Sequence, residues 1–321
     1  MAIARTHQSD IQAILGRLRH LGGEYWTTPD RRIGKGSPFA TVDCALMLAD
    51  LGVKRTDTVA RGVAEVLFEA WQEDGRFRVA PIGSIYPCHT ATVARVLCWL
   101  GHAGDRRLKG SFEHLLAAQH VDGGWRCNVC KLGRGAVSDA SNPGVTLAAL
   151  DAFRFTPLRN KEPRLNRAAS FLLDHWDFRR PLGPCEFGIG SRFMRVEYPF
   201  LRYNLFFYVY VLSFYEVARR DKRFGAAMNV LTSKLNKDGK MIVESPRREL
   251  ASLSFCKQGA PSELATKRYR EILQNLGGSR GARTGVAGAG AAKAKDKPTR
   301  KVEAGRAKPS RRSDRTTSRR R

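Results

Sequence analysis

The residues of this sequence best suited to chemistry are cysteines, and two of its seven cysteines lie close together. Cys127 and Cys130 are separated by two residues, a spacing that lets two thiolates bind one tetrahedral metal ion. A structural zinc site needs four soft ligands, and Cys88, His89 and Cys185 are the candidates for the other positions. The pattern therefore predicts a bound zinc or iron ion, provided that the fold brings these residues together. The alternative is that the cysteines are small apolar residues at helix ends.

Internal repeats indicate which elements would position these residues. Gly52 and Gly101 end similar apolar runs 49 residues apart, and Asp74 and Asp122 occupy similar turns 48 residues apart. A third run, residues 234–240, carries another Asp-Gly pair. A period of this length is typical of repeat proteins, and each half-period has the apolar spacing of a helix. The repeat unit is therefore expected to be a helical hairpin.

The predicted fold is all-α: an α/α toroid of about five helical hairpins. Residues 1–36 form an N-terminal helix, near 9–21, and a lead-in, and residues 37–276 form the toroid. The first helices of the pairs are expected near 38–51, 88–101, 142–154, 200–218 and 247–257. The second helices are expected near 57–71, 106–119, 163–176, 222–235 and 262–275.

Antiparallel pairs that close into a ring place every inner-helix start, and every loop after an outer helix, at one end of the ring. This topology gathers residues that are distant in sequence on one rim. The residues expected there are Asp43, Cys44, Cys88, His89, Cys127, Cys130, Ser141, Asn142, Cys185, Tyr203 and Asn204. Cys98 should not join them, because it lies about 15 Å further along its helix than Cys88.

The segment Gln119–Trp125 reads Gln-His-Val-Asp-Gly-Gly-Trp and resembles the signature of the prenyltransferase and squalene-oxidase repeat family. That family includes terpenoid cyclases and protein prenyltransferase β-subunits, and the resemblance covers roughly residues 37–245. The motif has a direct physical meaning: a glutamine that bonds carbonyls at a helix end, a tight turn with positive φ, and a tryptophan buried against its hairpin. The motif residues are Gln119, Asp122, Gly123, Gly124 and Trp125.

The resemblance implies an isoprenoid or other hydrophobic ligand in the centre of the toroid, where aromatic faces can stabilise cations. The predicted cavity residues are Trp99, Phe153, Tyr203, Asn204, Phe207 and Tyr208. The alternative is that these aromatic residues fill the centre. Two departures from the family are visible: Asn204 stands where prenyltransferases carry a zinc-binding histidine, and the acidic DxDD motif of squalene–hopene cyclases is missing. The catalytic residues are therefore unknown.

The composition indicates a basic C-terminal tail and a cytoplasmic location. Residues 277–321 carry 15 Lys and Arg against 3 Asp and Glu, within a total net charge of +26. This segment has too few apolar residues to fold and is expected to be disordered. It is a candidate for non-specific binding of an anionic partner, either a nucleic acid or an acidic protein. No secretory signal and no transmembrane run of about 18 apolar residues is visible, and the cysteine usage fits a reducing cytoplasm.

Two function classes remain open from the sequence. The first is an enzyme or ligand-binding protein of the terpenoid-cyclase and prenyltransferase type, with a cysteine-lined rim. The second is a non-catalytic helical-repeat module, stapled by a metal ion, with a basic tail that binds polyanions. A glycosidase is disfavoured, because Asp43, Asp139 and Glu186 show no paired spacing. Nucleotide chemistry is also disfavoured, because the sequence has no Walker or GxGxxG motif.

Overall fold

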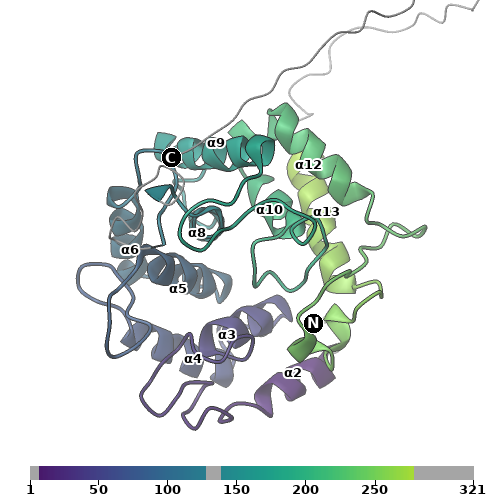
Figure 1. The fold of residues 1–321 in the computed structure, drawn as a ribbon. Coiled ribbons are helices and arrows are strands. Elements are labelled where there is room, and N and C mark those ends of the chain that lie inside the picture. Colours follow the sequence, from purple (N-terminus) through teal and green to yellow (C-terminus); the bar gives the residue numbers. More distant parts are fainter. Residues whose placement is uncertain (1–6, 128–138, 278–321) are drawn as a thin grey trace, which may run out of the picture. The chain divides into compact units, whose positions relative to one another are not determined.

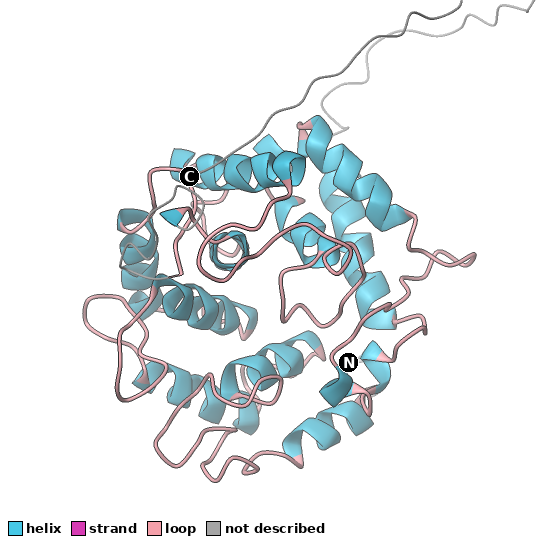
Figure 2. Cartoon of the chain, in the orientation of Figure 1, coloured by secondary structure: helices cyan, strands magenta, loops and turns pink. Residues whose placement is uncertain are grey.

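The structure is a computed structural model that describes residues 7–127 and 139–277. The described residues all belong to one compact unit. Cys130 and the basic tail from residue 278 onward lie outside the described residues, so the predictions for them stay predictions. Figure 2 shows helices and loops but no β-strand in the described part of the chain.

The described helices alternate along the chain between an inner and an outer layer. Helices α3, α5, α8 and α10 lie side by side around a centre, and α4, α6, α9 and α12 cover them from outside (Figure 1). Each inner helix packs on the outer helix that follows it, so the predicted α/α toroid is confirmed. The helices are α2 (Gln8–Leu15), α3 (Thr41–Asp50), α4 (Thr58–Glu69), α5 (Pro87–Trp99), α6 (Arg106–Ala117), α8 (Pro143–Phe153), α9 (Pro163–Phe178), α10 (Leu205–Leu212), α11 (Glu216–Arg219), α12 (Lys222–Thr232), η1 (Arg248–Leu250), η2 (Ser254–Cys256) and α13 (Glu263–Gly277).

The prediction of a helix over 247–257 was wrong, because this segment holds only the two short 3-10 turns η1 and η2. The backbone N–H of Ser254 donates to the Asp10 carboxylate at 2.7 Å, and its hydroxyl donates to the same group at 2.6 Å. An N–H bonded to a side chain cannot make the i→i−4 bond that a helix needs. Helix α13 packs on α10 and η2, and α2, which carries Asp10, packs on α3. The contact between Asp10 and Ser254 thus joins helix α2 to the C-terminal part of the described chain.

The residues of the repeat motif make the contacts that their chemistry predicts. Trp125 is fully buried, and its indole N–H donates to the Leu115 carbonyl at 2.7 Å. Gln119 donates from Nε2 to the carbonyls of Gly123 (2.5 Å) and Arg164 (2.8 Å). Gly123 has φ +95°, a conformation that favours glycine. The predicted burial of Trp125 against its own hairpin is confirmed.

The structure also shows a repeat feature that the sequence reading missed. In three repeats, the backbone N–H that follows the turn donates to a threonine hydroxyl in the first turns of the next helix. The pairs are Phe77 with Thr90, Trp125 with Thr146, and Met241 with Thr266, at 3.2, 3.0 and 3.0 Å. Each threonine therefore ties the end of one hairpin to the start of the next helix.

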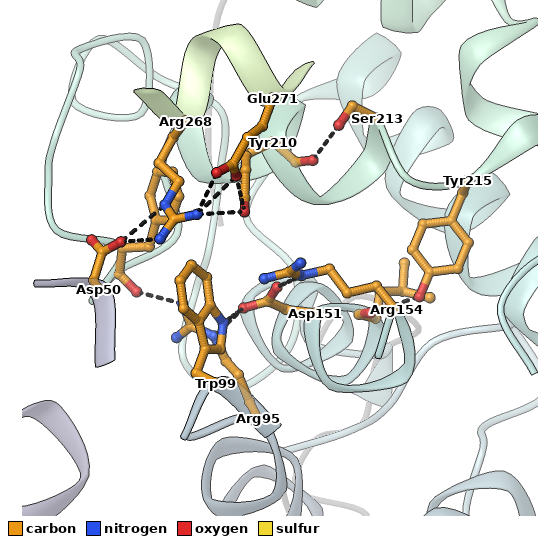
Figure 3. A network of polar contacts seen from close by, with 12 residues as sticks. Asp50, Arg95, Trp99, Asp151, Arg154, Tyr210, Ser213, Tyr215, Arg268 and Glu271 are labelled. Carbon is orange, nitrogen blue, oxygen red and sulfur yellow. Dashed lines mark hydrogen bonds and ion pairs between the residues drawn. The ribbon is translucent and has the colours of Figure 1, made fainter. Parts of the chain in front are cut away.

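At their C-terminal ends the inner helices are joined by buried ion pairs (Figure 3). Asp151 on α8 accepts hydrogen bonds from Arg95 and Trp99 on α5 (2.5 and 2.8 Å) and from Arg154 (2.5 Å). Burial alone raises the pKa of Asp151, but the charges of Arg154 and Arg95 outweigh it and hold that pKa below its ordinary value. Arg268 of α13 forms ion pairs with Asp50 and Glu271 and also donates to the Tyr210 hydroxyl. The charges are buried in pairs, which is the condition for tolerating them in a core.

None of the helices in the described ranges is long and apolar enough to cross a bilayer.

Candidate functional site

The inner helices line a central cavity of about 330 Å³ at their N-terminal ends, and this cavity is partly open to solvent. Helices α3, α5, α8 and α10 all contribute to its wall, which is apolar except for a few polar groups. The apolar lining residues are Val42, Leu46, Val96, Val145, Ala148, Phe187, Leu201 and Phe207, and the polar ones are Asp43, Thr92, Arg95, Asn142, Arg202 and Tyr203. Such a wall, mostly apolar with a few polar groups, is typical of small-molecule sites, and the volume lies near the lower end of their range of about 300–1,000 Å³.

Three of the predicted metal ligands meet at the edge of this cavity. The sulfurs of Cys185 and Cys127 lie 3.5 Å apart, and the Cys88 thiol donates to the Cys127 carbonyl at 3.5 Å. Burial, together with the neighbouring thiols, raises the pKa of Cys88 to about 12. The same causes raise the pKa of Cys185 to about 11, and hydrogen bonding with Asn142 partly opposes the shift. The ring topology thus places these cysteines together although 97 residues separate the first from the last.

His89, a further predicted ligand, is engaged in another contact. His89 accepts a hydrogen bond from the Tyr86 backbone N–H at 3.4 Å and lines a neighbouring cavity, where it acts as a helix cap. Cys130 lies outside the described residues. Within residues 7–127 and 139–277, no group of three or more His, Cys, Asp or Glu side chains could by itself hold a metal ion.

Asp43 is the carboxylate of the cavity wall. Its Oδ2 is buried and has no hydrogen-bond partner among the described residues, whereas Ser37 bonds the carboxylate from the other side. Burial raises the pKa of Asp43 above its ordinary value, and the Ser37 bond and the charges of Arg247 and Arg95 only partly offset this. A buried oxygen without a partner costs free energy unless a ligand or water bonds it. The sequence reading placed Asp43 at the rim but assigned it no role.

The six predicted cavity residues separate into two groups. Tyr203 and Phe207 line the cavity, and Asn204 caps α10 beside them by accepting the Phe207 N–H at 3.0 Å. The other three are engaged elsewhere. Trp99 belongs to the buried ion-pair network, Phe153 packs on Trp125 and Phe112, and Tyr208 packs on Trp176 and donates to the Leu172 carbonyl.

Arg95 is a further site residue that sequence reasoning missed. Its guanidinium lies 4.3 Å from the centre of the Phe207 ring and donates to Asp151 and to the Phe200 carbonyl. It therefore connects the cavity to the ion-pair network. No sequence signal marks it, because its partners are 56 and 105 residues away.

Comparisons with known proteins give distant structural similarities. No protein-family profile and no curated protein sequence matches the chain. Among solved structures, a polysaccharide lyase has 13% identity and a TM-score of 0.44, with 88% of this chain and 87% of that chain covered. A type II terpene cyclase from Scytonema, in complex with geranylgeranyl dihydroxybenzoate, has 13% identity and a TM-score of 0.44, with coverage of 88% and 77%. A protein from Actinoplanes has 19% identity and a TM-score of 0.38, with coverage of 77% and 79%. At these identities and TM-scores the similarities assign no function to the chain.

Proposed function

We propose that the central cavity binds a small hydrophobic ligand, with isoprenoids as the first class to test. The observation that carries the proposal is the cavity itself. Four inner helices contribute to its wall, this wall is mostly apolar, and it retains polar groups that could orient a ligand, among them the unpartnered Asp43 oxygen. The resemblance of residues 119–125 to the terpenoid-cyclase and prenyltransferase repeat supports the choice of ligand class.

The test is a binding measurement with farnesol, an uncharged isoprenoid alcohol, by titration calorimetry. Thr92 on α5 is half-buried and lines the cavity, so Thr92→Phe places a phenyl ring in the ligand's space. We expect this variant to bind farnesol at least about tenfold more weakly, because a filled cavity cannot admit the ligand without strain. Thr58→Phe, at an exposed position of the outer helix α4, is the matched control and should bind like the wild type. Equal affinities of all three proteins would refute the proposal.

We further propose that the cysteines at the edge of the cavity, Cys88, Cys127 and Cys185, bind zinc or iron. The 3.5 Å separation of the Cys127 and Cys185 sulfurs is close to the roughly 4 Å between two thiolates on one zinc ion, and Cys88 is adjacent. The bound ion would crosslink the loops after α6 and α9 to the start of α5.

Elemental analysis of purified protein should find about one metal ion per chain, lost in Cys127→Ser. Cys256→Ser is the control. Cys256 is buried in η2 and donates to the Leu250 carbonyl, a bond that a serine hydroxyl can also make. Metal-free wild-type protein would contradict the metal proposal and leave the cavity proposal standing.

The second candidate is a non-catalytic helical-repeat module. It is favoured by the scarcity of acid–base groups, since Asp43 is the one carboxylate among the described residues that line the central cavity. Glycoside hydrolysis normally needs two carboxylates flanking the bond, so this lining does not support it. In this reading the tail from residue 277 supplies polyanion affinity. Deleting residues 277–321 should then abolish salt-sensitive DNA binding and leave the melting temperature unchanged.

A further inference from the structure

Two cysteines from different loops lie with their sulfur atoms in contact at the edge of the central cavity. The Cys185 thiol donates to the Cys127 sulfur at 3.5 Å. The two sulfurs of a disulfide lie about 2.05 Å apart, so an approach of about 1.5 Å would let this bond form. Cys127 follows α6 and Cys185 follows α9, and neither residue is in a helix. Rotation of the two side chains and a small shift of the loops can therefore supply the approach.

Both loops are held by contacts beside the two sulfurs. The turn of the second loop is closed by Leu182, whose N–H donates to the Phe187 carbonyl at 3.1 Å. In the first loop, Arg126 donates to the Asp139 carboxylate at 2.6 Å, directly before Cys127. These contacts keep the two thiols close together in the folded chain, although 58 residues separate them. A bond between them forms within one molecule, at a high effective concentration.

The pair also differs from the other described cysteines in exposure and direction. Cys185 is exposed and Cys127 is half-buried, so a small oxidant in solution can reach them. Cys88 is half-buried as well, but its thiol donates to a backbone oxygen, the Cys127 carbonyl. The remaining described cysteines are buried in helical segments, Cys44 in α3, Cys98 in α5 and Cys256 in η2.

We propose that Cys127 and Cys185 form a reversible redox site, in which a small disulfide compound such as glutathione disulfide oxidises the two thiols to an intramolecular disulfide. In the first step, the Cys185 thiolate attacks one sulfur of glutathione disulfide, whose S–S bond breaks and releases one glutathione thiolate. In the second step, the Cys127 thiolate attacks the Cys185 sulfur of this mixed disulfide and releases the second glutathione thiolate. The two protons of the cysteine thiols pass to the two glutathione thiolates, and two electrons pass from the cysteine pair to glutathione disulfide.

The disulfide has two consequences for the edge of the central cavity. It connects the loop after α6 to the loop after α9, and both cysteines line the cavity. It also removes two of the three thiolates proposed as metal ligands, so oxidation and metal binding exclude each other. The second consequence rests on the proposed metal site, whereas the disulfide itself needs only the two sulfurs.

The experiment incubates the full chain, freed of metal with a chelator, in buffers of graded glutathione to glutathione disulfide ratio. Burial and the Cys127 sulfur raise the pKa of Cys185 to about 11, so little thiolate is present at neutral pH and the incubation continues until the products no longer change. The remaining thiols are then alkylated, and tryptic peptides are identified by mass spectrometry. At millimolar glutathione, we expect the linked peptides to be at least about tenfold more abundant than the mixed disulfide of Cys185, because the second step is intramolecular.

Matched serine variants assign the bond. Cys127 and Cys130 share one tryptic peptide, so Cys130→Ser distinguishes them and should retain the link. Cys127→Ser and Cys185→Ser should lose the link. Cys88→Ser and the buried control Cys256→Ser should retain it.

The redox site is overturned if metal-free wild type gives only the mixed disulfide. It is also overturned if the link disappears in Cys130→Ser, because Cys130 would then be the partner of Cys185. Zinc added before glutathione disulfide should lower the linked fraction at least about tenfold, because bound thiolates do not exchange. If zinc has no effect, the metal proposal fails and the redox site stands, whereas a missing link in metal-free protein refutes the redox site alone.

Discussion

Replacing Trp125 by alanine tests whether the repeat motif stabilises the toroid as the structure indicates. The side chain is fully buried, lies against the Phe153 ring with centroids 6.1 Å apart, and donates to the Leu115 carbonyl. Removing a buried tryptophan side chain costs about 3–5 kcal/mol of unfolding free energy. Trp125→Phe keeps most of the packing and leaves the Leu115 carbonyl without its donor, which should cost about 1–3 kcal/mol.

Urea denaturation followed by far-ultraviolet circular dichroism measures these differences. Val121→Ala is the control, because Val121 lies in the same loop and is 94% exposed, so its change should stay within about 0.5 kcal/mol. The reasoning is refuted if Trp125→Ala costs less than about 1 kcal/mol, or if the alanine and phenylalanine variants are equally stable.

Two further predictions concern the turn and the ion-pair network. Gly123→Ala should destabilise the protein by about 1–3 kcal/mol in urea denaturation, because the φ of Gly123 is +95° and the added Cβ would lie 2.9 Å from a backbone oxygen. The control is Gly104→Ala, which should be nearly neutral, because Gly104 has open space around it and no positive φ. Asp151→Asn should cost about 3–5 kcal/mol at neutral pH, because it leaves buried arginines without a counter-charge. The folded-state pKa of Asp151 is depressed, so its stabilisation is present above about pH 4 and is lost as the pH falls through that lower pKa. Melting curves should therefore show the gap between wild type and Asp151→Asn narrowing in acid, and a gap that widens would contradict the ion-pair account.

The repeat period and the Gln-x-x-Asp-Gly-Gly-Trp motif were sufficient to predict the ring and the common rim. Both follow from local chemistry: apolar helical spacing, a turn that favours glycine, and a tryptophan that must be buried. The same reasoning placed Cys88, Cys127 and Cys185 at one end of the ring, where the structure has them.

Features that depend on distant partners could not be predicted in this way. The segment 247–257 has a helix-like composition, but Asp10, more than 240 residues earlier, takes the N–H of Ser254. Trp99 is a second example. Its aromatic side chain suggested a cavity residue, but its indole N–H donates to Asp151 in the buried ion-pair network. A cavity of about 470 Å³ likewise joins two segments that are distant in sequence, the one around Arg192 and the one around Arg248.

The most direct test of the central claim is a crystal structure of the protein grown with a bromine-labelled long-chain alcohol. Anomalous scattering locates the bromine atom without reference to any expected pose. We predict a peak inside the central cavity, among Val96, Ala148 and Phe207. A structure in which side chains fill this space, or in which the bromine lies only on the outer surface, would contradict the account.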